Sequence, residues 1–176
     1  MRIVSGIYKG RRFNPPANLK ARPTTDIAKE GLFNILNNMV DFEELKVLDM
    51  FGGTGNISLE FASRGCRDIT LLELNSINYS FIKKVIAELG ADSINALKTD
   101  TFKFIERTGA KYDLIFADPP YDHKELPNIP DKIFSYGLLA EDGMLILEHP
   151  KDFSFSSHPH FYDHRNYGHV NFSFFK

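Results

Sequence analysis

The chain has 176 residues, of which 43% are hydrophobic and 25% are charged, and its formal net charge at pH 7 is −2. This length suits one domain, and the apolar fraction excludes a disordered chain. No apolar run approaches the roughly 18 residues that a membrane span needs, and the N-terminus lacks the apolar core of a secretory signal. Cys66 is the only cysteine, which is typical of a protein kept in a reducing cytoplasm.

The small net charge hides an uneven distribution along the chain. Residues 1–25 contain six basic side chains and no acidic one, whereas the rest of the chain carries a net charge of −8. The total alone argues against a nucleic-acid partner. It says little, however, about the electrostatic field at the N-terminal end.

The N-terminal region predicts two elements before any strand of a sheet. Residues 2–13 alternate loosely between apolar and basic side chains around two glycines, which predicts a short β-hairpin. An apolar stripe of helical spacing follows, so we expect a helix capped by Thr24 or Thr25 and ending near Met39.

The middle of the chain alternates between short β-rich runs and helical patterns. The runs, each a predicted strand, are residues 46–51, 69–74, 94–99, 112–117 and 144–148. The helical patterns lie near residues 56–64, 78–89, 102–107 and 129–138. Such alternation predicts an α/β domain with a mostly parallel sheet and helices on both faces.

The C-terminal tail changes character and completes the predicted domain. Its two aromatic runs, within residues 161–175, flank a turn and predict an antiparallel hairpin that closes the sheet. We expect one domain over residues 1–176, in which residues 1–23 form a basic extension and residues 24–176 a Rossmann-like core.

A glycine-rich loop follows the first predicted strand and leads directly into a helix. It reads Asp49-Met50-Phe51-Gly52-Gly53-Thr54-Gly55. In a doubly wound sheet, ligands bind at the carboxyl ends of the strands, and glycines let the backbone approach them closely. Ser58 stands where a dinucleotide fingerprint has its third glycine, which weakens the interpretation as a nicotinamide-dependent reductase. A tight turn without a ligand is the structural alternative.

Acidic residues end three successive predicted strands. Asp49, Glu73 and Asp100 occupy these positions, and the carboxyl ends of parallel strands meet at one edge of the sheet. A single acid at a strand end is usually solvated or caps a helix. A carboxylate such as Glu73 can also accept hydrogen bonds from both hydroxyls of a ribose. The three acids together predict a nucleoside pocket.

The fourth predicted strand ends in Asp118-Pro119-Pro120-Tyr121. The prolines make the loop rigid, and the Asp118 carboxylate and Pro119 carbonyl can accept hydrogen bonds from an exocyclic amine. Tyr121 offers a flat face on which a base can stack, worth roughly 1–3 kcal/mol. Two fixed acceptors aim the lone pair of a weakly nucleophilic aromatic amine at an electrophilic methyl group. A proline-rich turn with a capping aspartate is the alternative for this motif in isolation.

These motifs resemble those of class I S-adenosylmethionine-dependent methyltransferases that act on amines. VLDMFGGTG, the acids Glu73 and Asp100, and IFADPPY carry this likeness. RIVSGIYKGRR, ARPTTD and YGHVNFSFF resemble more specifically the bacterial family that methylates guanine N2 in 16S ribosomal RNA. The likeness covers essentially the whole chain.

The resemblance implies a Rossmann-like fold with a seven-stranded sheet and direct in-line methyl transfer to guanine N2 in 16S rRNA. It implies a cytoplasmic monomer whose cofactor is S-adenosylmethionine and whose partner is 16S rRNA or the small ribosomal subunit. The amine-holding catalytic residues it implies are Asp118, Pro119 and Tyr121. The cofactor-binding residues are Thr24, Asp49, Phe51, Gly53, Gly55, Glu73, Asp100 and Thr101. The basic residues expected to hold RNA phosphates are Arg2, Lys9, Arg11, Arg12 and Arg22.

Two other functions fit parts of the pattern. A DNA adenine or cytosine amino-methyltransferase shares the Asp118–Tyr121 motif, but such enzymes usually carry a target-recognition domain for which this chain has no room. A non-catalytic RNA-binding assembly factor is disfavoured because the motif residues are intact. We expect no metal site, since the His158–His160 pair has no acid or cysteine cluster at ligand spacing. The tail histidines are interpreted as surface or RNA-facing residues, namely His149, His158, His160, His164 and His169.

Overall fold

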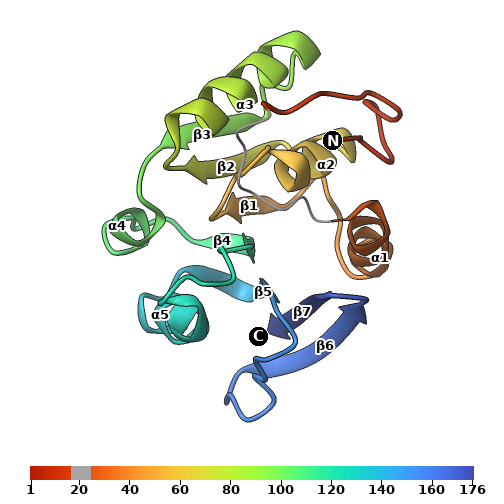
Figure 1. Ribbon diagram of the computed structural model, residues 1–176. Coiled ribbons are helices and arrows are strands. Elements are labelled where there is room, and N and C mark those ends of the chain that lie inside the picture. Colours follow the sequence, from red (N-terminus) through yellow and green to blue (C-terminus); the bar gives the residue numbers. More distant parts are fainter. Residues whose placement is uncertain (17–24) are drawn as a thin grey trace.

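A computed structural model describes residues 1–16 and 25–176, which form a seven-stranded mixed sheet in the order β3-β2-β1-β4-β5-β7-β6 (Figure 1). The strands are β1 (Lys46–Asp49), β2 (Asp68–Glu73), β3 (Ile94–Lys98), β4 (Tyr112–Ala117), β5 (Leu139–His149), β6 (Phe161–Tyr167) and β7 (Val170–Phe175). Strands β1 to β5 pair in parallel, and β7 is antiparallel to both β5 and β6. The predicted parallel sheet with a closing hairpin is confirmed.

Helices cover both faces of the sheet, as Figure 1 shows. One face carries α1 (Asp26–Leu36), α2 (Asn56–Ser63) and α3 (Ser76–Leu89). The other face carries α4 (Thr101–Ile105) and α5 (Ile129–Ser135), with the short 3₁₀ helix η1 (Leu126–Asn128) before α5. No helix in the described part of the chain is long and apolar enough to cross a membrane.

Successive residues of each strand contribute in turn to two hydrophobic cores, one on each face of the sheet. Val47 and Leu114 pack with the α1–α3 helices, whereas their neighbours Leu48 and Ile115 pack with α4 and α5. Successive side chains of a strand point to opposite faces, so a sheet covered on both sides needs apolar residues at consecutive positions. This explains why the predicted strands read as continuous apolar runs.

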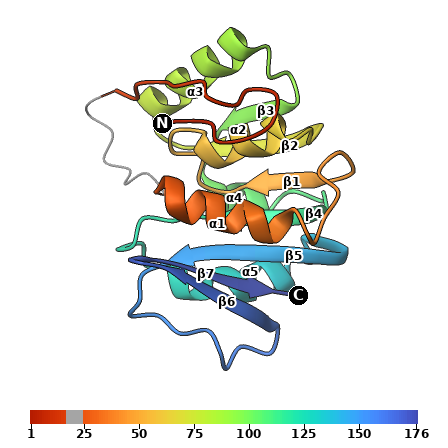
Figure 2. The same cartoon turned by 90° about the vertical axis from the view of Figure 1, so that its right-hand side faces the viewer.

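The predicted N-terminal β-hairpin is not shown; residues 2–13 form a loop closed by one antiparallel bridge between Arg2 and Arg12. Three backbone hydrogen bonds join its two arms, from the amides of Ile3, Gly10 and Phe13 to the carbonyls of Arg11, Ile3 and Met1, and other amides of the segment bond to α2. The Ile7 amide donates to the Ser63 carbonyl (2.7 Å), and the Tyr8 amide donates to the Ser63 hydroxyl (3.0 Å). A Cβ on Gly6 would lie 1.7 Å from the Ser63 oxygen, so this approach requires glycine. Figure 2 shows the segment running across the outer side of α2.

A buried charged group joins the N-terminal segment to α1 and α2. Lys29 of α1 is fully buried, donates to the Asn56 side chain (2.8 Å) and to the Arg2 carbonyl, and pairs with Glu60 (3.3 Å). Burial lowers the pKa of Lys29, and the neighbouring Glu60 opposes this shift. A buried ion pair of this kind fixes the position of the segment that carries the basic side chains.

Several helix and strand limits differ from those predicted, among them the end of α1 and the start of β5. Helix α1 begins after the cap Thr25, whose hydroxyl accepts from the Ala28 amide (3.2 Å), but it ends at Leu36 and not near Met39. Strand β5 begins at Leu139, and not at residue 144, because Asp142 (φ +58°) lets the chain enter the sheet through an irregular pairing. Strand β1 ends at Asp49 and not at residue 51, so Met50 and Phe51 belong to the loop that follows it.

The β6–β7 hairpin is fixed against α1 by a close contact. A Cβ on Gly31 would lie 2.2 Å from the Tyr167 ring, so α1 offers a flat surface on which this ring packs. The contact holds the turn between β6 and β7 beside the start of α1, at the edge of the sheet where the parallel strands end.

Candidate functional site

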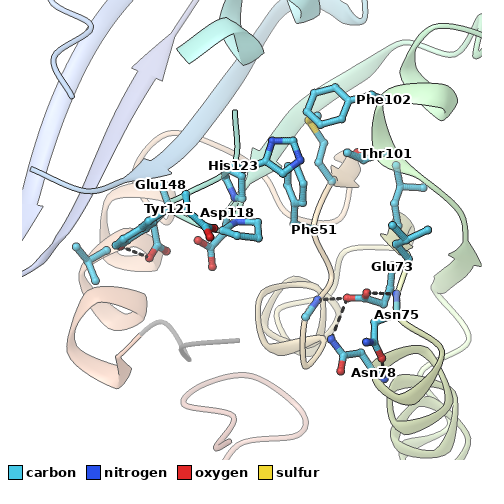
Figure 3. A pocket seen from close by; sticks show the side chains of 18 of the residues that line it. Phe51, Glu73, Asn75, Asn78, Thr101, Phe102, Asp118, Tyr121, His123 and Glu148 are labelled. Atoms are coloured by element: carbon cyan, nitrogen blue, oxygen red, sulfur yellow. Dashed lines mark hydrogen bonds between the residues drawn. The ribbon is translucent and has the colours of Figure 1, made fainter. Parts of the chain in front are cut away.

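A cavity of about 1250 Å³ lies at the carboxyl ends of the parallel strands (Figure 3). The segments that follow β1, β2, β3 and β4 all contribute to its lining, together with the end of β5, the start of α1 and the β6–β7 turn. The sheet order reverses direction between β1 and β4, and such a switch point is where open α/β sheets bind ligands.

The glycine loop is pressed tightly against β2. The Gly52 amide donates to the Leu72 carbonyl (2.8 Å), and a Cβ on Gly52 would lie 2.4 Å from the Leu71 side chain. Gly53 (φ +55°) and Gly55 (φ +78°) have left-handed backbones that other residues rarely adopt. The loop therefore requires glycine for its shape, and Gly53 lines the cavity.

Glu73 ties the glycine loop to the start of α3. One carboxylate oxygen accepts from the Gly53 amide (2.8 Å) and from the Asn78 side chain (3.4 Å). The other oxygen accepts from the Asn75 amide (2.6 Å), and Figure 3 shows this network on one side of the cavity. Glu73 is half-buried, so its carboxylate is both held in place and accessible from the cavity.

The segment after β3 adds a second carboxylate and an apolar wall. Asp100 caps α4 by accepting from the Lys103 amide (2.9 Å). The Thr101 hydroxyl is buried and has no hydrogen-bond partner among the described residues, although Thr101 lines the cavity. Phe102 stacks on His123 with ring centroids 5.2 Å apart, and Phe51 meets both rings edge-on. A buried hydroxyl without a partner is costly unless a ligand supplies one.

Asp49 lies beneath the glycine loop and does not line the cavity. It is 1% exposed, and one of its oxygens accepts from the Ser58 hydroxyl (2.7 Å). The other oxygen has no hydrogen-bond partner among the residues that the structure describes. Burial raises the pKa of Asp49 to about 6, partly opposed by the Ser58 hydrogen bond. Gly55 likewise lies behind the loop and outside the cavity lining.

We expect Asp49 to make the free energy of unfolding fall as pH rises from about 4 to about 6. In this range folded Asp49 holds a proton that the unfolded chain has lost, so rising pH favours unfolding. Urea denaturation of the wild type and Asp49→Asn at pH 4.5 and 7.5 measures this. Relative to the wild type, the free energy of unfolding of Asp49→Asn should be about 2 kcal/mol higher at pH 7.5 than at pH 4.5. A difference that does not change with pH would contradict the raised pKa.

The loop after β4 forms the opposite side of the cavity from Glu73. Asp118, Pro119 and Tyr121 all line it, with Pro119 buried and Tyr121 half-buried. The Tyr121 hydroxyl donates to Glu148 of β5 (3.2 Å), a carboxylate that is only 4% exposed. Figure 3 shows Asp118, Tyr121 and Glu148 grouped together.

Part of the cavity lining is exposed at the start of α1 and in the β6–β7 turn. Ile27 of α1 lines the cavity and is 75% exposed, and His169 of the turn is also exposed. Thr25 lies on the boundary with a second hollow of about 570 Å³, whose lining includes Arg2 and Arg12. The basic segment therefore adjoins the cavity.

The structure brings most of the predicted site residues together. The predicted basic residues differ in whether they form ion pairs. Arg2 forms ion pairs with Asp26 and Glu30, and Arg11 forms one with Glu88. Lys9 and Arg12 are exposed. Thr24 and Arg22 lie outside the described residues. The predicted cofactor and catalytic residues that line the cavity are Phe51, Gly53, Glu73, Asp100, Thr101, Asp118, Pro119 and Tyr121.

Several residues of the cavity were not singled out by the sequence. Glu148 ends an apolar run just as Glu73 does, so the same rule applied to the fifth strand would have found it. Asn75 and Asn78 follow the second strand, where polar residues also serve as helix caps. His123 and Tyr167 carry no sequence signal, because only tertiary packing brings them to the cavity.

Cys66 and His149 lie outside the lining of the cavity. Cys66 is buried, and burial raises the pKa of its thiol to about 11, which disfavours a thiolate nucleophile. The prediction that His149 is a surface residue is wrong, because it is 1% exposed. Its position in β5 places the ring on a covered face of the sheet, where it bonds to the Ser173 hydroxyl of β7 (2.8 Å). Among residues 1–16 and 25–176, no group of three or more His, Cys, Asp or Glu side chains is arranged to hold a metal ion.

Comparison with known proteins places the chain in a family. The family model described as conserved hypothetical protein 95 matches residues 1–176. Ribosomal RNA small subunit methyltransferase D of Buchnera aphidicola subsp. Baizongia pistaciae is 34% identical over 152 residues, covering 84% of this chain and 75% of that protein. The protein of that name from Escherichia coli K12 is 29% identical over 148 residues, covering 84% and 74%.

A solved structure agrees with these sequence relationships. A hypothetical protein of Thermus thermophilus matches with a TM-score of 0.86 and 25% identity, covering 100% of this chain and 99% of that chain. The fold, the placement of the motif residues and the full-length family match lead to one conclusion. The chain belongs to the conserved hypothetical protein 95 family, the family of the ribosomal RNA small subunit methyltransferases D.

Proposed function

We propose that the chain transfers a methyl group from S-adenosylmethionine to the N2 amine of a guanine in small-subunit (16S) ribosomal RNA. The observation that carries this proposal is a single cavity with two chemically distinct sides. One side presents the carboxylates of Glu73 and Asp100, and the other presents the rigid loop from Asp118 to Tyr121. The names of the Buchnera and Escherichia coli relatives support a ribosomal RNA substrate.

The Glu73 side fits the cofactor. A carboxylate accepts about four hydrogen bonds, and Glu73 already accepts three, so it has one position for a ribose hydroxyl while it holds the glycine loop and a second if the long Asn78 contact (3.4 Å) gives way. Asp100 and the unpartnered hydroxyl of Thr101 offer polar atoms for an adenine edge, and Phe102 offers an apolar ring face. When bound, the cofactor supplies an electrophilic methyl group on a sulfonium centre.

The Asp118 side fits the guanine amine. The two prolines hold the loop, so the Asp118 carboxylate and the Pro119 carbonyl are fixed acceptors for the two amine hydrogens. They orient the nitrogen lone pair without reorganisation during the reaction. Tyr121 supplies a face for the ring of a guanine that has left its stack, as base-modifying enzymes require. Direct in-line transfer needs no protein nucleophile, in accord with the buried thiol of Cys66.

The basic N-terminal segment is proposed to hold RNA phosphates next to the cavity. Exposed ion pairs contribute roughly 0–1 kcal/mol, so Arg2 and Arg11 can exchange their acidic partners for phosphates at little cost. Lys9 and Arg12 are exposed and lie on the same loop.

Removing Lys9 and Arg12 together should weaken RNA binding and make it less dependent on salt. Each lost phosphate contact lowers the slope of log K against log salt by about 0.7 to 0.9, so the double alanine variant should lose about 1.5. Fluorescence anisotropy with 16S RNA fragments over a salt series measures this. An Arg67→Ala/Lys111→Ala protein removes the same charge at the amino ends of β2 and β4, away from the cavity. Equal slopes for the two double variants would contradict an RNA surface at the N-terminus.

The proposed substrate class is tested by offering labelled S-adenosylmethionine with four acceptors: naked 16S rRNA, small ribosomal subunits, duplex DNA and total cell protein. We expect label in RNA or in the subunits and none above background in DNA or protein. Label in DNA would instead support the amino-methyltransferase alternative. Binding to RNA without label in any acceptor would support the non-catalytic assembly factor.

A further inference from the structure

Glu148 is a buried carboxylate of the cavity to which the proposed methyl transfer assigns no role. It lies in β5, is 4% exposed and lines the cavity beside the loop that follows β4. Its oxygen Oε1 accepts a hydrogen bond from the Tyr121 hydroxyl (3.2 Å). Burying a carboxylate is costly, so its presence here needs a reason beyond packing.

The strand register places Glu148 directly beside Asp118. Ala117 of β4 pairs with Leu147 of β5, and both side chains belong to the core on the α4–α5 side. Because successive strand residues point to opposite faces, Asp118 and Glu148 emerge together on the other face. Neighbouring strands are about 4.8 Å apart, and Asp118 and Glu148 each follow the last registered pair, so we infer that one base can reach both side chains. Figure 3 shows them grouped with Tyr121.

Two adjacent acceptors match guanine better than adenine. On its Watson–Crick edge guanine presents the N1 hydrogen next to the N2 amine, so donors occupy neighbouring positions. Adenine presents an unprotonated N1 acceptor next to its N6 amine. With the amine held by Asp118, a carboxylate facing N1 accepts a hydrogen bond from guanine but meets a lone pair on adenine.

We propose that Glu148 determines the base specificity of the reaction by accepting the N1 hydrogen of the target guanine. This inference rests on the proposed function and names a residue that selects its substrate. The Tyr121 hydroxyl holds the Glu148 carboxylate in place, so the residue that stacks on the base also orients the residue that reads its edge. A carboxylate has several acceptor positions and can bond to both groups.

The test replaces the target guanosine, once mapped on the 16S RNA, with 2-aminopurine. This base keeps the N2 amine but lacks the N1 hydrogen and O6. We expect the wild type to methylate the substituted RNA with a kcat/KM roughly 10- to 100-fold lower, as expected for the loss of a hydrogen bond to a charged group. In Glu148→Gln the side-chain amide can donate to the unprotonated N1. The preference for guanine over 2-aminopurine should therefore fall by at least about 10-fold.

The ratio of the two rates separates specificity from general damage. Glu141→Gln is the matched control, because it makes the same substitution at an exposed residue of the same strand outside the cavity lining, and its ratio should equal that of the wild type. If Glu148→Gln methylates both RNAs too slowly to measure, the ratio of its Kd values for the two RNAs gives the same comparison. Fluorescence anisotropy competition measures these Kd values. An unchanged preference in Glu148→Gln would overturn the inference. The proposed function would still stand if the wild type forms N2-methylguanosine on the unsubstituted RNA, and would fail if it does not.

Discussion

Asp118→Ala should lose methyl transfer while keeping its affinity for the cofactor. Asp118 lies on the side of the cavity opposite Glu73, and its carboxylate is one of the two acceptors proposed to hold the target amine. Removing one preorganised polar group at a reacting centre typically lowers kcat by roughly 10²–10³. Single-turnover methylation of small subunits measures the chemical step, and calorimetric titration with S-adenosylmethionine measures binding.

Two further variants sharpen this result. Asp118→Asn keeps one carbonyl acceptor and should retain more activity than Asp118→Ala. Asp122→Ala changes an exposed acid in the same loop and should methylate at the wild-type rate. Full activity in Asp118→Ala would remove the loop from the mechanism. A parallel loss of cofactor affinity would instead move Asp118 to the cofactor side of the cavity.

Glu73→Ala should lose cofactor binding. The substitution removes the proposed hydrogen bonding to the ribose and also frees the amides of Gly53 and Asn75, which Glu73 holds at 2.8 and 2.6 Å. Hydrogen bonds to charged groups contribute about 1.5–3 kcal/mol each, so Kd for S-adenosylmethionine should rise by at least roughly 100-fold. Calorimetric titration measures this directly.

The controls for Glu73 separate the ribose contact from loop order. Glu73→Gln keeps one acceptor oxygen, so its Kd should lie between those of the wild type and Glu73→Ala. Glu43→Ala removes an exposed acid that pairs with Arg67, at the other end of the sheet, and should bind the cofactor normally. A wild-type Kd in Glu73→Ala would show that the cofactor does not use this carboxylate.

Much of the fold was predictable because the chain obeys local rules. Continuous apolar runs mark strands covered on both faces, and the acids Glu73 and Asp100 fall at strand ends where one cavity collects them. The tail hairpin followed from its aromatic runs and turn. These features depend on the spacing of apolar residues and on the alternation of strand and helix patterns, and both can be read from the sequence.

The differences arise where tertiary contacts outweigh local pattern. The N-terminal segment was predicted as a hairpin, but it forms only one bridge, and the amides of Ile7 and Tyr8 bond to Ser63 of α2. Asp49 follows the strand-end rule yet is buried beneath the glycine loop, because the loop folds over it. Glu148 differs from Asp49 in this respect: it is an acid at a strand end and does line the cavity. The pairing of β5 with β4 places it near Asp118.

The identity of the methylated nucleoside decides whether this cavity methylates the N2 amine of guanine. Small subunits lacking the modification are incubated with labelled S-adenosylmethionine, and their RNA is digested to nucleosides that are separated and identified by mass spectrometry. We expect all label in N2-methylguanosine. Label in N6-methyladenosine or in a methylated cytidine would contradict the proposed function.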